Sequence, residues 1–263
     1  MVGLAQFDNG DGRVGGLLVE SISAFFPAYN DAATIGGLVE KTFVVLQASQ
    51  RDFEIIVIDD GSADRTPEVL HDLQTRYGGA LRVIRHPVNR GYGGALRSGF
   101  AAATKDLVFY TDGDGQYDPG EISLLLERME PGVGLVNGYK IKRHDPLHRI
   151  VIGEIYRLFV RFVFGIRIQD VDCDFRLIRR SYLSKAGLRS DTGAICVELL
   201  QALAFLGCKA VDVPVHHYPR IAGSSQFFRW RSIFRTLRQL GYLYFRRCPA
   251  LRASAREVLE PHP

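Results

Sequence analysis

Long hydrophobic runs are absent from this sequence of 263 residues. A membrane-spanning helix needs about 18 or more consecutive apolar residues, and the most apolar stretch, residues 150–168, is interrupted by a glutamate and by arginines. Residues 1–20 contain acids and glycines where a signal peptide would have an apolar segment. We therefore expect no membrane span, and we interpret residues 1–17 as a flexible tail.

Cysteine pairs and a strong charge excess are also missing. The cysteines, Cys173, Cys196, Cys208 and Cys248, form no Cys-x-x-Cys pair, which argues against a zinc ribbon or a disulfide scaffold and favours a reducing, cytoplasmic compartment. The net charge is only +4, so we expect no nucleic-acid partner. Acids dominate two loops of the first half and arginines dominate the C-terminal half, which favours a metal or nucleotide site followed by a site for an anionic partner.

The first 140 residues alternate between strand patterns and helix patterns. We expect strands at residues 17–27, 54–60, 81–86, 106–111 and 133–137, and helices at residues 31–49, 64–77, 92–104 and 119–130. Asp31 is a suitable N-cap for the first helix. The alternation predicts an α/β fold, in which a mostly parallel sheet has helices on both faces. In such sheets ligands bind outside the carboxyl ends of the strands.

The second half of the chain is less regular, and it shows no repeat and no clear linker. We expect helices at residues 147–164, 198–207 and 228–245, and strands at residues 175–179 and 210–215. The last helix is basic and aromatic. Such a helix either lies in a membrane interface beside anionic lipid or covers the core with its arginines in water.

The strongest chemical signal is Asp112-Gly113-Asp114, which follows an apolar strand pattern. Side chains alternate between faces along a strand, so carboxylates at i and i+2 point the same way. Two such carboxylates suit Mg²⁺ or Mn²⁺, which keeps other positions for water and phosphate oxygens. An isolated Asp-x-Asp is usually only an acidic turn, but its place after a buried strand favours a metal. An EF-hand is excluded, because Gln116 and Tyr117 do not fit that loop.

Tandem acids, Asp59 and Asp60, end a second buried strand pattern and precede Gly61. Neighbouring buried carboxylates repel each other and lose hydration, so they need a use. One use is to accept hydrogen bonds from a nucleobase or ribose, and the other is to cap the following turn. We expect one acid to serve each purpose.

A glycine-rich segment, residues 89–100, begins with Asn89 and Gly91. Glycines before a helix allow backbone amides to approach an anion. The segment lacks the third glycine of a dinucleotide site and the lysine of a P-loop. Taken alone, it favours tight helix packing over phosphate binding.

In order and spacing, these motifs resemble those of the inverting family 2 glycosyltransferases of GT-A fold. The motifs are PAYND (27–31), VIDDGSADRT (57–66), NRGYGGALRSGF (89–100) and DGDGQYDP (112–119). The nearest branch is that of dolichol-phosphate mannose synthase and the polyprenyl-phosphate glycosyltransferases, and the resemblance extends over residues 20–226. It implies a catalytic domain at residues 18–226, with a donor half (18–138) and an acceptor half (139–226), followed by a C-terminal helix and tail (227–263).

The resemblance also implies a nucleotide-sugar donor, UDP- or GDP-linked, and a Mg²⁺ or Mn²⁺ ion on its diphosphate. Asp112 and Asp114 would hold the metal, with Gln116 as a further candidate ligand. Asp60 would lie near the base. The remaining candidate donor-binding residues are Pro27, Ala28, Tyr29, Asn30, Asp31, Asp59, Gly61, Asn89, Gly91 and Gly113.

For the acceptor half, the resemblance implies a polyprenyl phosphate as acceptor and a place at the inner face of the cell membrane. Lys140, Arg149, Arg220 and Ser225 are the candidate acceptor-binding residues, and each arginine is otherwise a solvated surface cation. Asp170 is the candidate catalytic base if the acceptor is instead a soluble hydroxyl compound.

At two positions in the acceptor half the sequence departs from the branch. Asp174 stands where the branch commonly has glycine, and Gln226 stands where lysine is common.

Two other function classes are disfavoured by the residues present. A non-catalytic nucleotide-sugar-binding protein is disfavoured because Asp60, Asp112 and Asp114 are intact. A nucleotidyltransferase is disfavoured because no glycine-rich loop with lysine or arginine follows the first strand.

Overall fold

A seven-stranded sheet forms the centre of the computed structural model, which describes residues 13–14, 17–18, 20–141, 147–220 and 234–245. The strand order is β5-β4-β3-β6-β8-β7-β9. The strands are β3 (Ile22–Ala28), β4 (Phe53–Asp59), β5 (Leu81–Arg85), β6 (Leu107–Thr111), β7 (Val133–Lys140), β8 (Phe175–Arg179) and β9 (Lys209–Val215). A separate antiparallel pair is formed by β1 (Arg13–Val14) and β2 (Leu17–Leu18).

The sheet is mostly parallel, as the alternation of patterns predicts. β3 pairs in parallel with β4 and β6, and β7 pairs in parallel with β9. β8 is antiparallel to both of its neighbours, β6 and β7. Every residue of β3 is buried, which explains why its sequence is a continuous apolar run rather than an alternating one.

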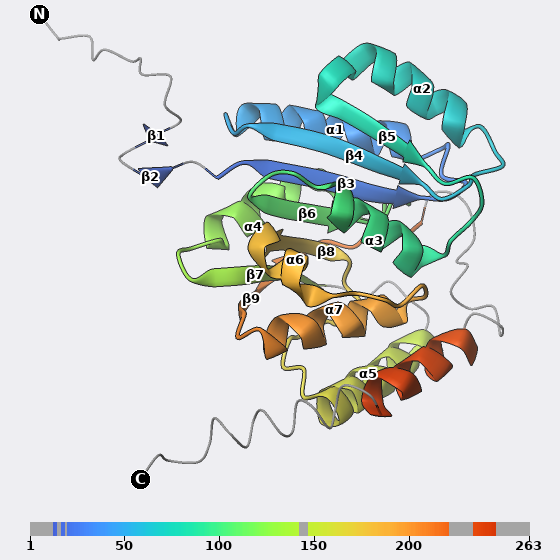
Figure 1. Cartoon of the computed structure of the whole chain (residues 1–263), viewed down its shortest axis with the longest axis vertical. Coiled ribbons are helices and arrows are strands. Elements are labelled where there is room, and N and C mark those ends of the chain that lie inside the picture. Colours follow the sequence, from blue (N-terminus) through green and yellow to red (C-terminus); the bar gives the residue numbers. More distant parts are fainter. Residues whose placement is uncertain (1–12, 15–16, 19, 142–146, 221–233, 246–263) are drawn as a thin grey trace, which may run out of the picture.

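Helices cover both faces of the sheet (Figure 1). Side chains of α1, α2 and α4 share one hydrophobic cluster with Ile22, Ala24 and Phe26. Side chains of α3, α5, α6 and α7 share a second cluster with Phe25 on the opposite face. The helices are α1 (Ile35–Ala48), α2 (Thr66–Tyr77), α3 (Tyr92–Ala102), α4 (Ile122–Arg128), α5 (Leu147–Phe164), α6 (Arg180–Ala186) and α7 (Ala194–Phe205), with 3-10 turns η1 (Gly78–Ala80) and η2 (Pro119–Glu121).

The structure corrects several local expectations. Asp31 does not cap α1 with its side chain, because the carboxylate accepts a hydrogen bond from the Tyr29 amide instead. The first strand of the main sheet begins at Ile22 rather than at residue 17, α7 begins at Ala194 rather than at 198, and the sequence patterns did not reveal α6. Cys173, Cys196 and Cys208 are free thiols, and Cys248 lies outside the described residues.

A helical segment at residues 234–245 is the described part of the expected C-terminal helix. Leu240 and Leu243 belong to the same hydrophobic cluster as Val160 and Phe164 of α5, at the bottom of the view in Figure 1. In the part of the chain that the structure describes, no helix is both long enough and apolar enough to cross a bilayer.

Candidate functional site

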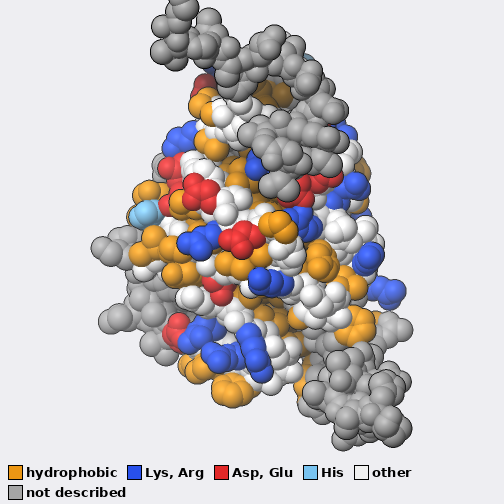
Figure 2. All heavy atoms as spheres, turned by 90° about the vertical axis from the view of Figure 1, so that its left-hand side faces the viewer, with side chains coloured by type: hydrophobic (Ala, Val, Ile, Leu, Met, Phe, Trp, Pro, Cys, Tyr) orange, Lys and Arg blue, Asp and Glu red, His pale blue; other side chains and the backbone are white. Residues whose placement is uncertain are grey.

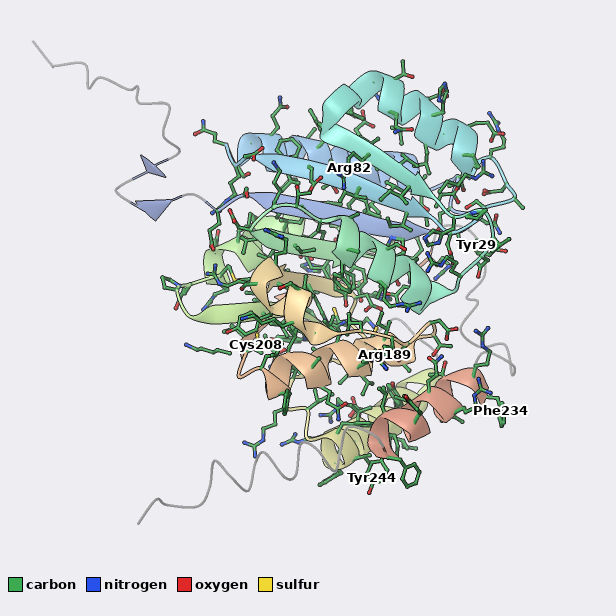
Figure 3. The ribbon with its side chains drawn as sticks, in the orientation of Figure 1. Tyr29, Arg82, Arg189, Cys208, Phe234 and Tyr244 are labelled. Carbon is green, nitrogen blue, oxygen red and sulfur yellow. The ribbon has the colours of Figure 1, made fainter. Side chains whose placement is uncertain are left out.

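The carboxyl ends of β3, β4 and β6 lie side by side, and the turns that follow them interlock. The Asp60 amide donates to the Ala28 carbonyl at 2.9 Å, and the Gly113 amide donates to the Pro27 carbonyl at 3.2 Å. Tyr29 marks this edge in Figure 3. On the opposite edge, where these strands begin, acidic, basic and hydrophobic side chains are interspersed (Figure 2). The fold therefore gathers the predicted donor segments at one edge of the sheet.

Gly113 allows the turn after β6 to pass close to the turn after β3. A Cβ atom at this position would lie 2.7 Å from the Pro27 carbonyl oxygen and 3.2 Å from Asp31 Oδ2. The Thr34 hydroxyl donates to the Gly113 carbonyl at 2.7 Å. The close approach explains the glycine between the two aspartates and places Asp31 beside them.

The Asp112 and Asp114 carboxylates lie among other acids. Thr111 of β6 pairs with Phe175 of β8, so Asp112 and Asp174 are the next facing positions of this antiparallel pair. Burial raises the pKa of Asp112 well above its ordinary range, and the charges of Asp174 and Asp114 raise it further. Burial also raises the pKa of Asp31, to about 6. This edge therefore gathers several buried acids whose charged forms are costly without a positive partner.

Arg220 supplies positive charge to the pair. Its Nη2 atom donates to Asp114 Oδ2 at 2.5 Å, and the other oxygen, Oδ1, accepts from the Gln116 amide at 3.1 Å. Burial raises the pKa of Asp114, and the Arg220 charge opposes that rise. Asp114 is 7% exposed, so bulk water solvates its carboxylate little. Arg220 is the positive charge that contacts it.

The residues at this edge fit a divalent cation. Hard oxygen ligands and uncompensated negative charge are what Mg²⁺ and Mn²⁺ require. The part of the chain that the structure describes holds no group of three or more His, Cys, Asp or Glu side chains arranged around a metal position. A cation on Asp112 and Asp114 would therefore complete its shell with donor oxygens or water. The Gln116 side-chain amide donates to the Tyr218 carbonyl at 3.0 Å, which leaves Oε1 as its ligand atom.

Asp59 and Asp60 have different surroundings. Asp59 accepts from the Ser62 amide at 2.8 Å and lies 3.2 Å from Arg85 Nε, so it stabilises the turn. Asp60 Oδ1 accepts from His86 Nδ1 at 2.6 Å and from the Arg90 amide at 2.9 Å. None of the described residues donates to Asp60 Oδ2, which is the acceptor atom open to a ligand.

The turn after β3 is held by Asn30. Asn30 has a positive φ of 58°, a conformation that asparagine tolerates better than most residues. Its side-chain oxygen accepts from the Ala63 amide at 2.9 Å, and its own amide donates to the Ser62 hydroxyl at 3.0 Å. Asn30 thus ties the Tyr29–Asp31 turn to the turn after Asp60.

The glycine-rich start of α3 is covered by protein. A Cβ atom on Gly91 would lie 2.5 Å from the Asp191 carbonyl oxygen, and the Gly93 amide donates to the same oxygen at 3.2 Å. These glycines therefore allow close packing of the backbone, as the segment taken alone predicts. Asn89 is exposed and its side chain accepts from the Gly91 amide.

Lys140, a candidate acceptor-binding residue, and Asp170, the candidate base, lie next to each other. Lys140 Nζ is 4.0 Å from Asp170 Oδ2 and donates to the Asp172 carbonyl at 3.1 Å. Burial opposes the charged form of Lys140, but the neighbouring aspartates outweigh it and raise the pKa of the amine. Arg149 lies in the first turn of α5, and Ser225 lies outside the described residues.

Arg176 is a site residue that the sequence patterns did not single out. It is 0% exposed, and it donates to Asn137 Oδ1 at 2.7 Å, to Tyr110 Oη at 2.5 Å and to the Val171 carbonyl at 2.5 Å. Its Nη1 atom also lies 3.2 Å from Asp174 Oδ1. Its position between Phe175 and Leu177 in β8 was the available signal. Arg176 joins β8 to both neighbouring strands behind the acidic edge.

Comparisons with known proteins agree with the motifs. The family model described as "Glycosyl transferase family 2" matches residues 23–187. An undecaprenyl-phosphate 4-deoxy-4-formamido-L-arabinose transferase from Enterobacter sp. (strain 638) is 28% identical over 217 residues, 82% of this chain and 65% of that protein. The protein of the same name from Pseudomonas aeruginosa (strain LESB58) is 30% identical over 215 residues, 81% of this chain and 62% of that protein. The chain thus spans less than two thirds of these relatives.

A solved structure shares the fold. Glucosyl-3-phosphoglycerate synthase from Mycobacterium tuberculosis, in complex with Mn²⁺ and uridine-diphosphate-glucose, superposes with a TM-score of 0.60 at 22% identity, covering 84% of this chain and 76% of that chain. The likeness confirms the prediction of a GT-A fold. With the family model matching most of the domain, the resemblance seen in the motifs is confirmed, and the chain belongs to glycosyl transferase family 2.

Proposed function

We propose that this chain transfers a sugar from a nucleoside-diphosphate sugar to an acceptor, with inversion at the anomeric carbon. One observation carries the proposal: in a family 2 domain, Asp60 follows β4 and the Asp112–Asp114 pair follows β6, and the backbone after each strand donates to the end of β3, which lies between them. That edge offers an acceptor atom for the nucleoside and a carboxylate pair for the diphosphate. Both are needed to hold a nucleotide sugar in one orientation.

Asp112 and Asp114, with Gln116, would hold Mg²⁺ or Mn²⁺ against the diphosphate. A divalent cation in this position neutralises the negative charge that gathers on the departing diphosphate. Arg220 brings a fixed positive charge to Asp114, so it would stabilise the same departing charge. The Tyr29–Asp31 turn would close the pocket, and Asp60 Oδ2 would accept a hydrogen bond from uracil, guanine or ribose.

The acceptor in this proposal is a polyprenyl phosphate, as the names of the undecaprenyl-phosphate relatives suggest. A phosphate monoester has a second pKa of about 6, so its oxygen is already a nucleophile at neutral pH. The phosphate oxygen would attack the anomeric carbon while the bond to the nucleoside diphosphate breaks. Such an acceptor needs cations to hold it, and Lys140, Arg149 and Arg220 are the candidates.

A soluble hydroxyl acceptor is the alternative, and it would require a base. Asp170 is the candidate, because a sugar hydroxyl needs a carboxylate within reach to take its proton. Lys140 Nζ lies 4.0 Å from Asp170 Oδ2 and donates to the Asp172 carbonyl. A cation is therefore already present beside the candidate base, and a cation is what a phosphate acceptor needs, which supports the phosphate acceptor.

A lipid acceptor also requires contact with a membrane surface, and we propose that α5 and the 234–245 segment provide it. Large apolar side chains of both are exposed: Ile155 at 63%, Phe162 at 81%, Phe234 at 65%, Leu237 at 57% and Phe245 at 78%. Figure 3 labels Phe234 and Tyr244 on this segment. Arg161 and Arg238 are exposed on the same two elements. Exposed aromatic side chains with arginines nearby are typical of helices that lie in an anionic interface.

The two acceptor classes are separated by a transfer assay. Labelled UDP-sugars and GDP-sugars with Mn²⁺ are offered to a short polyprenyl phosphate and, in parallel, to a pool of soluble sugars and phosphorylated metabolites. The proposal expects transfer to the lipid phosphate, severe loss in Arg220→Ala and retention of most activity in Asp170→Asn. Transfer only to soluble hydroxyls, with Asp170→Asn inactive, would select the alternative. Absence of transfer and of metal-dependent donor hydrolysis would reject both.

A further inference from the structure

Tyr92, the first residue of α3, reaches the acidic pair from a different element. Its hydroxyl donates to Asp112 Oδ1 at 2.8 Å. We infer that Tyr92 is a positioning residue, whose hydrogen bond fixes the Asp112 carboxylate and leaves Oδ2 available for the cation of the donor complex. The inference rests on the proposed function, because it assigns Asp112 to that cation.

Asp112 needs such a partner because its neighbours repel it. It faces Asp174 across the β6–β8 pairing and stands two residues from Asp114. Asp114 has Arg220 and Asp174 has Arg176 within 3.2 Å, but the Tyr92 hydroxyl is the only donor that the described residues offer to the Asp112 side chain. Without this hydrogen bond, repulsion from Asp174 would favour rotation of the Asp112 side chain away from the position in which it and Asp114 could bind one cation.

Tyr92 itself is held firmly. Gly91 and Gly93 flank it, and both contact the Asp191 carbonyl oxygen. The Tyr92 ring packs on the hydrophobic cluster that α3 shares with α7. The backbone and the ring of Tyr92 therefore both have packing partners that hold the hydroxyl beside Asp112.

The loop that holds Tyr92 is in turn tied to the 234–245 segment. Arg235 Nη2 donates to Asp191 Oδ2 at 3.0 Å, and the Gln239 side chain also donates to Asp191. The Thr192 hydroxyl donates to Gln239 Oε1 at 2.7 Å. A continuous set of contacts thus leads from the C-terminal segment to Tyr92, so we expect Asp191→Ala to act on the metal site in the same direction as loss of the Tyr92 hydroxyl.

The test measures Mn²⁺ binding in the presence of saturating UDP, by following free Mn²⁺ with electron paramagnetic resonance. Tyr92→Phe removes only the hydroxyl, and Tyr77→Phe at the end of α2 is the matched control. We expect Tyr92→Phe to weaken Mn²⁺ binding ~10- to 100-fold, the factor for losing a hydrogen bond to a charged group. Binding of UDP without metal, the thermal midpoint and the Tyr77→Phe variant stay at wild-type values.

A double mutant distinguishes positioning from a general structural effect. In an Asp112→Asn background, Tyr92→Phe causes no further loss if it acts through Asp112. Wild-type Mn²⁺ affinity in Tyr92→Phe, or an equal loss in both backgrounds, would overturn the inference while leaving the proposed function intact. A wild-type protein that binds no Mn²⁺ with UDP would overturn both.

Discussion

Arg220 and Asp114 are 106 residues apart in the sequence, and Arg220 Nη2 lies 2.5 Å from Asp114 Oδ2. The contact joins the segment after β9 to the carboxylate pair after β6. Lys140 contacts Asp170 and Asp172 instead, so among the described residues Arg220 is the cation that directly touches the pair. In the function proposed above, Arg220 would lie where the departing diphosphate and an incoming phosphate meet.

Replacement of Arg220 tests that position. Arg220→Ala removes a charge next to the leaving group, and we expect kcat/KM for transfer to fall by about 10²-fold, the scale for losing one preorganised donor at a developing charge. Arg76→Ala removes an exposed arginine paired with Glu40 on α1 and should leave kcat/KM unchanged. Steady-state kinetics with both substrates varied make the comparison, and equal kinetics in the two variants would contradict the role of Arg220.

Asp60→Asn tests the nucleoside pocket. Both protein donors, His86 Nδ1 and the Arg90 amide, reach Oδ1, so the asparagine oxygen can keep them while the amide group replaces Oδ2. An acceptor becomes a donor, and we expect nucleotide binding to weaken by about 1–3 kcal/mol with little change in thermal midpoint. Calorimetric titration with UDP and GDP measures it. Unchanged affinity for both would assign Asp60 to the turn alone.

Gly93→Ala tests the packing at the start of α3. An added Cβ would overlap the Ser190 carbonyl oxygen and approach the Asp191 backbone, so we expect a loss of about 1–3 kcal/mol in the free energy of unfolding, the usual cost of overpacking. Gly37→Ala in α1 is the control, because nothing lies within 4 Å of its added Cβ. It should stabilise the helix by about 0.5–1 kcal/mol. Denaturant unfolding measures both variants. A change in the free energy of unfolding of the same sign in Gly93→Ala and Gly37→Ala would contradict the packing described for Gly93.

Phe162→Ser tests the membrane surface. Phe162 is 81% exposed on α5, and Val44 is 60% exposed on α1, across the sheet. We expect Phe162→Ser to reduce sedimentation with vesicles that contain anionic lipid several-fold, because an aromatic side chain loses its place in the interface. Val44→Ser should sediment like the wild type. Equal sedimentation of the wild type and both variants would contradict the proposal that α5 contacts the membrane.

The sequence was most informative where function and local pattern coincide. Asp112, Asp114 and Asp60 were predicted because each follows an apolar strand run, and strand ends of a parallel sheet meet at one edge. Asp31 was wrongly expected to cap α1, because its alternative partner, the Tyr29 amide, is two residues away and equally local.

Contacts between distant segments could not be predicted. Arg176 is one of two arginines in a short strand, and only the antiparallel placement of β8 brings it beside Tyr110 and Asn137. Tyr92 was hidden in a glycine-rich segment whose purpose becomes clear when Asp191, about a hundred residues later in the chain, packs on it. Single-sequence patterns carry little information about such pairings.

The central claim is that Asp112 and Asp114 bind the donor's diphosphate through a divalent cation. The most direct measurement is calorimetric UDP binding with Mn²⁺ and with a chelator, in the wild type, Asp114→Asn and Asp72→Asn, which removes an exposed carboxylate of α2. The account predicts that Mn²⁺ strengthens UDP binding at least tenfold in the wild type and in Asp72→Asn, and that Asp114→Asn loses this gain. UDP binding that is independent of Mn²⁺ in the wild type, or a full Mn²⁺ gain in Asp114→Asn, would contradict it.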